Sequence, residues 1–171
     1  LNDSLKKYSN YGSYLPNKEK VSNKIISAMA NFGRSIVSFD KKILVNLSYA
    51  AGVLRFYEIK DRALIHRKDA VVKPMNFKVK NDDYQLQDGL GFLDASISDN
   101  YVYALYSGEK ENFNAPMPTA SYVYKYDYQG NLKDVYHLDK AASTLAVKND
   151  DSQLFTIVDD PNSKVFVYNL K

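Results

Sequence analysis

The sequence predicts an all-β protein made of about three four-stranded antiparallel blades of a β-propeller, with one short helix near the N-terminus. Two repeated features predict this fold. Pairs of β-rich runs meet at tight turns that contain Asp40, Asp99 and Asp151, and these turns recur roughly every 50 to 60 residues, the length of one blade. Each pair is followed by a strand with an aromatic–polar–apolar triplet. The triplets are Tyr57-Glu58-Ile59, Tyr126-Asp127-Tyr128 and Tyr168-Asn169-Leu170.

The composition agrees with a β-rich domain and excludes several classes of function. The 171 residues are enough for one domain with a real core, and the 15 Tyr and 8 Phe suit the half-buried surfaces of strands. The net charge is only +3 with both signs interspersed, so we expect no nucleic-acid partner. No apolar run is long enough to span a membrane. Because the chain contains no cysteine, disulfide bonds and catalysis by a thiolate are excluded.

Each unit contains strands separated by turn residues. In the first unit the predicted strands are residues 36–39, 43–49, 53–59 and 63–67. In the second unit they are residues 95–98, 101–106, 121–128 and 132–137. Gln129-Gly130-Asn131 forms the last hairpin turn of that unit, because Gly and Asn tolerate positive φ. The third unit supplies strands at residues 144–147, 153–158 and 164–170.

These units divide one partial propeller domain, residues 1–171, into successive blades. The predicted blades are residues 32–80, 92–140 and 141–171. Residues 5–11 are expected to supply either the outer strand of the last blade or the outer strand of a preceding, absent blade. Because an arc of three blades exposes two broad faces, we expect the ring to be completed either by missing N-terminal blades or by a second copy in a homodimer.

A short helix is expected within residues 17–31. Val21, Ile25 and Met29 recur at i, i+4 and i+8 and define one apolar face, and Asn17 is the candidate N-cap. This apolar face is expected to pack on the arc of blades.

A series of short segments, in order along the chain, resembles the C-terminal half of the TolB-like six-bladed β-propeller proteins found widely in Bacteroidetes. The segments are residues 11–16 (YGSYLP), 38–43 (SFDKKI), 54–59 (LRFYEI), 91–95 (GFLDA), 101–108 (YVYALYSG), 130–133 (GNLK), 136–139 (YHLD) and 167–170 (VYNL). The resemblance implies a six-bladed ring exported to the periplasm or cell surface, often tethered there as a lipoprotein. It implies no catalytic residues.

The predicted strand order places the long connections, including residues 81–93 and 109–120, on one face of the propeller. Loops on a rigid scaffold commonly carry binding residues, so we expect a ligand on this loop face. The best recognition loop combines charge, an aromatic side chain and nearby prolines, although a mobile insertion would have the same composition. Its candidate ligand-binding residues are Glu109, Lys110, Asn112 and Phe113.

Three acidic residues are further candidates for ligand binding. Asp94 heads the innermost strand of the middle blade, near the mouth of the central channel, and Asp159 and Asp160 lie in a later loop of the same face. The residues expected at the position of Asp94 in the other units are Arg34 or Ser35 and Ser143. An oxygen-ligand metal site needs several converging acids, so we predict neither a metal nor a cofactor.

Aromatic and histidine side chains have structural interpretations. Tyr122, Tyr124, Tyr126 and Tyr128 alternate along one strand and therefore share one side, which we expect to be buried between blades. The only histidines, at positions 66 and 137, fall on predicted outer strands, where a catalytic triad or a shared metal is not expected.

We therefore predict a non-enzymatic binding or scaffolding module whose loop face holds a protein, peptide or glycan. A calcium-dependent propeller hydrolase or lactonase, with acids at the channel mouth, is the alternative. The residues that head the innermost strands separate the two hypotheses, because three or more converging Asp, Glu or Asn side chains would favour the enzyme.

Overall fold

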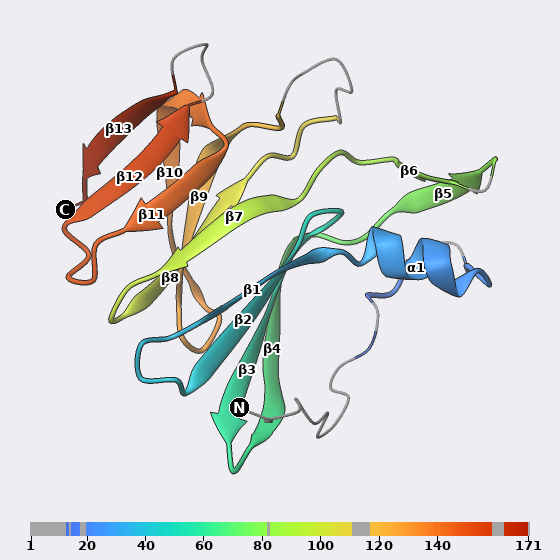
Figure 1. The fold of residues 1–171 in the computed structure, drawn as a ribbon, viewed down its shortest axis with the longest axis horizontal. Helices are drawn as coiled ribbons and strands as arrows, with labels where there is room; N and C mark the ends of the chain where they lie inside the picture. Colours follow the sequence, from blue (N-terminus) through green and yellow to red (C-terminus); the bar gives the residue numbers. More distant parts are fainter. Residues whose placement is uncertain are drawn as a thin grey trace, which may run out of the picture.

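The computed structural model describes residues 13, 15–17, 20–81, 83–110, 117–158 and 163–170, and its strands form three large antiparallel meanders and one small hairpin (Figure 1). Blade 1 contains β1 (Gly33–Val37), β2 (Ile43–Ser48), β3 (Gly52–Lys60) and β4 (Ala63–Lys73). Blade 2 contains β7 (Phe92–Ile97), β8 (Tyr101–Tyr106), β9 (Ala120–Asp127) and β10 (Leu132–Ala142). Blade 3 contains β11 (Thr144–Val147), β12 (Gln153–Val158) and β13 (Lys164–Asn169). The predicted all-β fold with four-stranded antiparallel sheets is confirmed, and these sheets do not close into a ring within the described residues.

The first strand of each blade lies innermost. β7 contacts both β1 and β11, so these three strands run side by side where the sheets converge, and the later strands of each blade spread outwards (Figure 1). Consecutive blades pack face to face, because each sheet alternates its side chains between two sides. We refer to the side that faces the preceding blade in the sequence as the N-side face and to the other as the C-side face.

Two apolar cores hold the three blades together. Between blades 1 and 2, Leu47 and Phe56 on the C-side face of blade 1 belong to the same cluster as Val102 and Tyr126 on the N-side face of blade 2. The rings of Phe56 and Tyr126 lie 6.1 Å apart. A second cluster joins blades 2 and 3 in the same way. Each internal blade–blade contact therefore buries one C-side face against one N-side face.

Serine side chains stabilise two of the predicted tight turns. The hydroxyl of Ser38 accepts hydrogen bonds from the backbone of Lys42 and Ile43, and the hydroxyl of Ser98 accepts from Asn100 and Tyr101. Both serines are buried, so these bonds satisfy backbone donors that the turns leave without ladder partners. The tight turns predicted at Asp40 and Asp99 are thus present, and serines that the sequence analysis did not single out stabilise them.

The carboxylate of Asp127 organises the turn between β9 and β10. It accepts hydrogen bonds from the backbone of Gln129 and Asn131 and forms an ion pair with Lys133 at 2.8 Å. Gly130, at the tip, has a φ of +77°, as the sequence predicted for this hairpin. Burial alone raises the pKa of Asp127, but the hydrogen bonds from Lys133 and Asn131 outweigh burial and lower the pKa to about 2.

This lowered pKa predicts a pH dependence of stability. A carboxyl with a lower pKa in the folded state stabilises the fold above its unfolded pKa of about 3.9, and the stabilisation is lost as the pH falls through the folded pKa. Between about pH 4 and pH 2 we expect the wild-type chain to lose about 1 kcal/mol more unfolding free energy than Asp127→Asn. Urea unfolding followed by circular dichroism measures both, with Asp134→Asn as the control on β10. Equal pH slopes for wild type and Asp127→Asn would contradict this assignment.

The tyrosine ladder of β9 is mostly buried, as predicted. Tyr126 is fully packed between blades 1 and 2, and Tyr124 and Tyr128 pack against the same cluster while partly exposed. The rings of Tyr124 and Tyr126 stack at 6.4 Å. Tyr122, at the end of the ladder, is 43% exposed. The ladder therefore serves blade packing over most of its length.

The helical prediction was right in kind and wrong in detail. α1 spans Lys24–Ala30, and its N-cap is Asn23, whose side chain accepts from the backbone of Ile25. Asn17 instead exchanges two hydrogen bonds with the backbone of Phe77. The predicted face points outwards: Ile25 and Met29 are exposed, whereas the buried residues are Ile26 and Ala30.

The physical reason is the neighbourhood of α1. Ile26 and Ala30 pack against Ala50, Ala51 and Val53 of blade 1, in a cluster that also includes Met75 and Phe77. The hairpin of β5 (Phe77–Lys80) and β6 (Asp83–Leu86) completes this cluster beside α1 (Figure 1). The sequence analysis assigned no strand to β5, which it counted with the first blade, and it placed β6 in a connection, whereas the two strands form a separate two-stranded sheet. A tertiary surface, and not the spacing of apolar residues alone, selects the buried side of the helix.

The predicted strand ends shift most on the outer strands. β4 and β10 run to Lys73 and Ala142, past their predicted ends, and both contain register shifts. Blade 3 has three strands among the described residues, and residues 5–11, predicted to supply a fourth, lie outside them. Within the described residues no helix is both long and apolar enough to cross a membrane.

Candidate functional site

Three structurally equivalent residues meet where the innermost strands begin. Arg34, Asp94 and Thr144 each sit beside an apolar residue of the second strand in their blades, and these partners are Leu47, Leu105 and Ile157. The sequence analysis named Arg34 or Ser35 as the equivalent of Asp94 in blade 1 and Ser143 as the equivalent in blade 3. In the structure the equivalent residue of blade 3 is Thr144, one residue later, because β11 begins there.

Asp94 is buried and links all three blades. Its carboxylate forms an ion pair with Arg34 of β1 and accepts a hydrogen bond from the hydroxyl of Thr144 in β11. It also accepts from the backbone of Leu145 at 3.0 Å and from the backbone of Ala95 at 2.9 Å. A carboxylate offers about four acceptor positions, so these four donors occupy its capacity. We refer to this arrangement as the hub.

The hub bears on the calcium hypothesis. At the two positions equivalent to Asp94, blade 1 supplies a cation and blade 3 supplies a hydroxyl that donates to Asp94. Among the described residues, no group of three or more His, Cys, Asp or Glu side chains is placed to hold a metal ion. The hub is therefore suited to joining blades, and ligand binding by Asp94 stays a prediction.

A cleft of about 280 Å³ lies beside the hub on the predicted loop face. Its lining is mostly apolar and comes from the start of β7 and from the connections that follow β2 or precede β7, β9 and β11: Tyr49, Leu90, Leu93, Met117, Pro118 and Ser143. Leu93 and Ser143 directly precede the hub residues Asp94 and Thr144 in the chain. We refer to this cavity as the loop-face cleft.

The loops around this cleft are held together by backbone hydrogen bonds. Gly91 donates to the carbonyl of Tyr49 at 2.6 Å, and Leu90 donates to the carbonyl of Glu109 at 2.8 Å. The hydroxyl of Ser107 donates to the carbonyl of Thr119 at 3.0 Å. Because these hydrogen bonds join the loops to one another, the cleft is largely preformed, and binding costs less conformational entropy.

The structure brings some of the predicted site residues to this end of the blades. Asp94 lies in the hub, and Glu109 and Lys110 are exposed on the connection whose backbone pairs with Leu90. The predicted ligand-binding residues outside the described part of the chain are Asn112, Phe113, Asp159 and Asp160. No geometry tests their role, and it stays a prediction.

Sequence reasoning missed the apolar lining of the cleft. Leu90 and Met117 fall in segments that it treated as connections and searched for polar ligands, and Tyr49 was placed at the end of a predicted strand. Large apolar side chains inside predicted loops could have indicated this cleft, because such side chains are unfavourable in a loop that is fully exposed to water.

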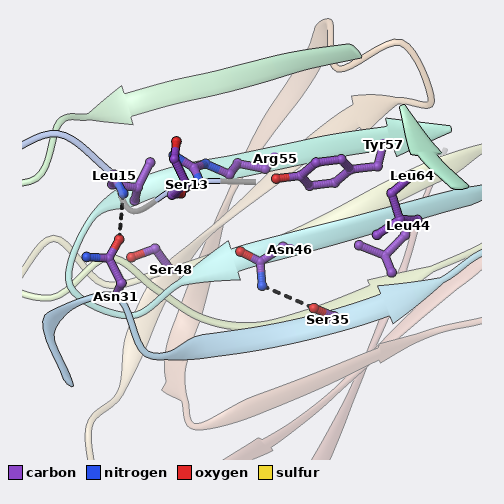
Figure 2. A pocket seen from close by; sticks show the side chains of 10 residues that line it. All are labelled: Ser13, Leu15, Asn31, Ser35, Leu44, Asn46, Ser48, Arg55, Tyr57 and Leu64. Atoms are coloured by element: carbon purple, nitrogen blue, oxygen red, sulfur yellow. Dashed lines mark hydrogen bonds between the residues drawn. The ribbon is translucent and has the colours of Figure 1, made fainter. Parts of the chain in front are cut away.

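A larger hollow, of about 510 Å³, lies elsewhere, on the N-side face of blade 1. Figure 2 shows Ser35, Asn46 and Arg55 side by side across β1, β2 and β3, with Leu44 and Tyr57 in the neighbouring row. Asn46 donates to the hydroxyl of Ser35 at 3.1 Å, and the Nε of Arg55 lies 3.7 Å from Asp69. The lining is thus a sheet face and contains little of the loop face.

The comparisons with known proteins agree with this architecture. The family described as TolB-like 6-blade propeller-like matches residues 2–150. No protein among the curated sequences matches the chain.

Two solved structures are similar in fold. The β-propeller domain of Cps50 (Swd1) from Myceliophteria thermophila has 10% sequence identity and a TM-score of 0.53, over 81% of this chain and 40% of that chain. A candidate 6-phosphogluconolactonase from Bacteroides fragilis has 14% identity and a TM-score of 0.54, over 82% of this chain and 35% of that chain. The chain thus spans less than half the length of either solved propeller, and the likeness at these identities concerns the fold alone.

Proposed function

Because the chain belongs to the TolB-like 6-blade propeller-like family, we propose that it is a non-enzymatic binding module that holds an apolar side chain of a protein or peptide in the loop-face cleft. The observation that carries this proposal is the cleft itself, a mostly apolar cavity lined by connections beside the hub. Rigid blades with loops of variable sequence are a common arrangement for recognition.

The size and chemistry of the cleft support a side chain as the ligand. Cavities that enclose a whole small molecule have volumes of about 300–1,000 Å³, and the 280 Å³ here falls below that range. The lining offers aromatic, aliphatic and thioether surface from Tyr49, Leu90 and Met117. Met and Tyr are favoured where a protein binds apolar side chains of a partner, because they supply adaptable or rigid contact area. Glu109 and Lys110, exposed nearby, are proposed to contact polar groups around the anchor.

The hub supports binding over the hydrolase or lactonase alternative. A calcium-dependent enzyme needs several oxygen ligands that converge on the ion. At the equivalent positions of this chain, Arg34 instead pairs with Asp94, and Thr144 donates to it. If the alternative were correct, millimolar calcium would raise the melting temperature and Asp94→Asn would abolish that rise.

The proposal predicts a specific response of one methionine methyl group. The chain has three methionines: Met117 lines the cleft, Met29 is exposed on α1 and Met75 is buried beneath it. In a chain labelled with ¹³C-methyl methionine, titration with N-acetyl-phenylalanine amide is expected to shift the Met117 signal, with a Kd of about 1 mM for one side chain. The signals of Met29 and Met75 are expected to stay in place.

Matched variants sharpen this titration. Leu90→Ser removes apolar lining and is expected to weaken binding about tenfold, whereas Leu132→Ser, at an exposed leucine of β10, leaves it unchanged. No movement of Met117, or equal movement of Met29, would refute a specific apolar site. A shift of Met117 with N-acetylglucosamine and not with the phenylalanine probe would assign the cleft to a glycan.

We also propose that the module works outside the cytoplasm, in the periplasm or at the cell surface, as the family resemblance implies. Attachment through a lipid stays a prediction. Cell fractionation with and without a lipoprotein-processing inhibitor tests both statements, since a cytoplasmic chain would contradict the first and an unchanged soluble fraction the second.

A further inference from the structure

The side chain of Arg34 begins next to one wall of the loop-face cleft. In the ladder between β1 and β2, Arg34 lies opposite Leu47. The ladder continues past β2, because the backbone of Tyr49 donates to the carbonyl of Phe32 at 3.3 Å. Arg34 and Tyr49 are therefore diagonal neighbours, whose Cβ atoms lie about 7–8 Å apart, within reach of a long side chain. Tyr49 lines the cleft, so the charged side chain starts beside it.

The hub holds the guanidinium of Arg34 at the inner side of the cleft. The guanidinium forms an ion pair with Asp94, which directly follows the cleft residue Leu93. Asp94 also accepts from the hydroxyl of Thr144, which directly follows the cleft residue Ser143. These contacts lie where β1, β7 and β11 run side by side (Figure 1). The guanidinium is thus fixed one residue along the strands from the lining of the cleft.

The two members of this ion pair differ in what they show to a ligand. The side chain of Asp94 is 5% exposed, and its acceptor positions are occupied by the four donors of the hub. The side chain of Arg34 is 53% exposed. A guanidinium has five N–H donors, and among the described residues only Asp94 accepts from this one, through Nη1. A molecule that enters from the loop face therefore meets the cation and not the carboxylate.

The chemistry around the cleft suits a carboxylate. A guanidinium presents a planar fork of donors that matches the two oxygens of a carboxylate. No acidic residue is among the described residues that line the cleft. Glu109 and Lys110, exposed on the neighbouring connection, carry opposite charges that cancel. The exposed edge of Arg34 is thus a source of positive charge that the surroundings of the cleft do not neutralise.

An apolar cavity beside a cation matches the end of a polypeptide chain. In a C-terminal residue the α-carboxylate is separated from the side chain only by the α-carbon, so both groups can be held at neighbouring points. A residue inside a chain has neutral amides on both sides and cannot form an ion pair with Arg34 through its backbone. The arrangement therefore favours a terminal apolar residue over an internal one.

We propose that the loop-face cleft recognises the C-terminal residue of a protein or peptide, with the apolar side chain in the cleft and the carboxylate on Arg34. This inference rests on the proposed function and narrows its ligand. Arg34 is the residue that contacts the carboxylate. Asp94 is a positioning residue, because it holds the guanidinium and leaves its outer edge exposed.

Two probes that differ only at the carboxyl group test the proposal in the wild-type chain. N-acetyl-phenylalanine is expected to shift the Met117 methyl signal with a Kd about tenfold lower than that of N-acetyl-phenylalanine amide at about pH 7. Sodium chloride at about 0.5 M is expected to reduce this preference, since salt screens a half-exposed ion pair. Equal Kd values would overturn the C-terminal proposal and leave the apolar site in place. If neither probe moved Met117, the proposed function would fail, and this inference with it.

Variants assign the preference to one cation. Arg34→Gln is expected to bind the acid no more tightly than the amide, and its amide titration shows whether the cleft is intact. Arg34→Lys keeps the charge without the fork and is expected to keep a preference of about threefold. Arg62→Gln removes the same charge at an exposed turn between β3 and β4 and is expected to keep the full preference. An undiminished preference in Arg34→Gln, or its loss in Lys110→Gln, would refute the assignment to Arg34.

Free phenylalanine distinguishes a chain terminus from a free amino acid. Its ammonium group would lie close to the guanidinium of Arg34, so it is expected to bind more weakly than N-acetyl-phenylalanine. Tighter binding of free phenylalanine would assign the cleft to amino acids and overturn the proposal.

Discussion

Replacing Asp94 with alanine is expected to lower the free energy of unfolding by about 3 kcal/mol. The substitution removes one acceptor that serves four donors from three blades, and the backbone N–H groups of Ala95 and Leu145 are left buried without partners. Arg34 is half exposed and can turn towards water, so most of the cost comes from the buried donors and not from the lost ion pair. For a chain of this length, about 3 kcal/mol corresponds to a fall of roughly 10 °C in Tm.

Two variants separate the hub from a general effect of surface charge. Asp94→Asn keeps the shape but places an amide donor among donors, so we expect it to retain only part of the stability. Asp99→Asn changes an exposed carboxyl at a turn of the same blade and is expected to shift stability by less than about 0.5 kcal/mol. Urea unfolding followed by tyrosine fluorescence measures all three. An Asp94→Ala chain as stable as the Asp99→Asn chain would show that the hub contributes nothing.

The blades could be predicted because their signals are local. β8, β11 and β12 begin and end where the sequence analysis placed them, since apolar and aromatic runs are bounded there by Asp, Asn and Ser turns. The repeated tyrosines at positions 57, 126 and 168 mark equivalent places in the third or last strand of each blade. Turn-forming residues and the alternation of apolar and polar residues were therefore sufficient to predict the strands and their grouping into blades.

The hub and the cleft depend on contacts between segments that are far apart in the sequence. Nothing near Asp94 indicates that its carboxylate will meet Arg34 and Thr144, because those contacts depend on the register of three sheets. An error of one residue, Ser143 for Thr144, was enough to hide the triad. The buried side of α1 was misjudged for the same reason: its partners, Ala50 and Ala51, belong to another element.

Replacing Gly91 with alanine is expected to cost about 3 kcal/mol and to weaken the loop-face cleft at the same time. A β-carbon at this position would lie 1.9 Å from the carbonyl oxygen of Ala51 and 2.7 Å from that of Ser48. Both are backbone atoms, which cannot rotate away, so the connection after β2 must move and carry Tyr49 out of the cleft.

Urea unfolding measures the loss of unfolding free energy in Gly91→Ala, and the Met117 signal of this variant is expected not to respond to the phenylalanine probe. Gln87→Ala, at an exposed residue before the same loop, is the control and is expected to change neither quantity. If Gly91→Ala kept wild-type stability and binding, the close approach of these two loops would not be what forms the cleft.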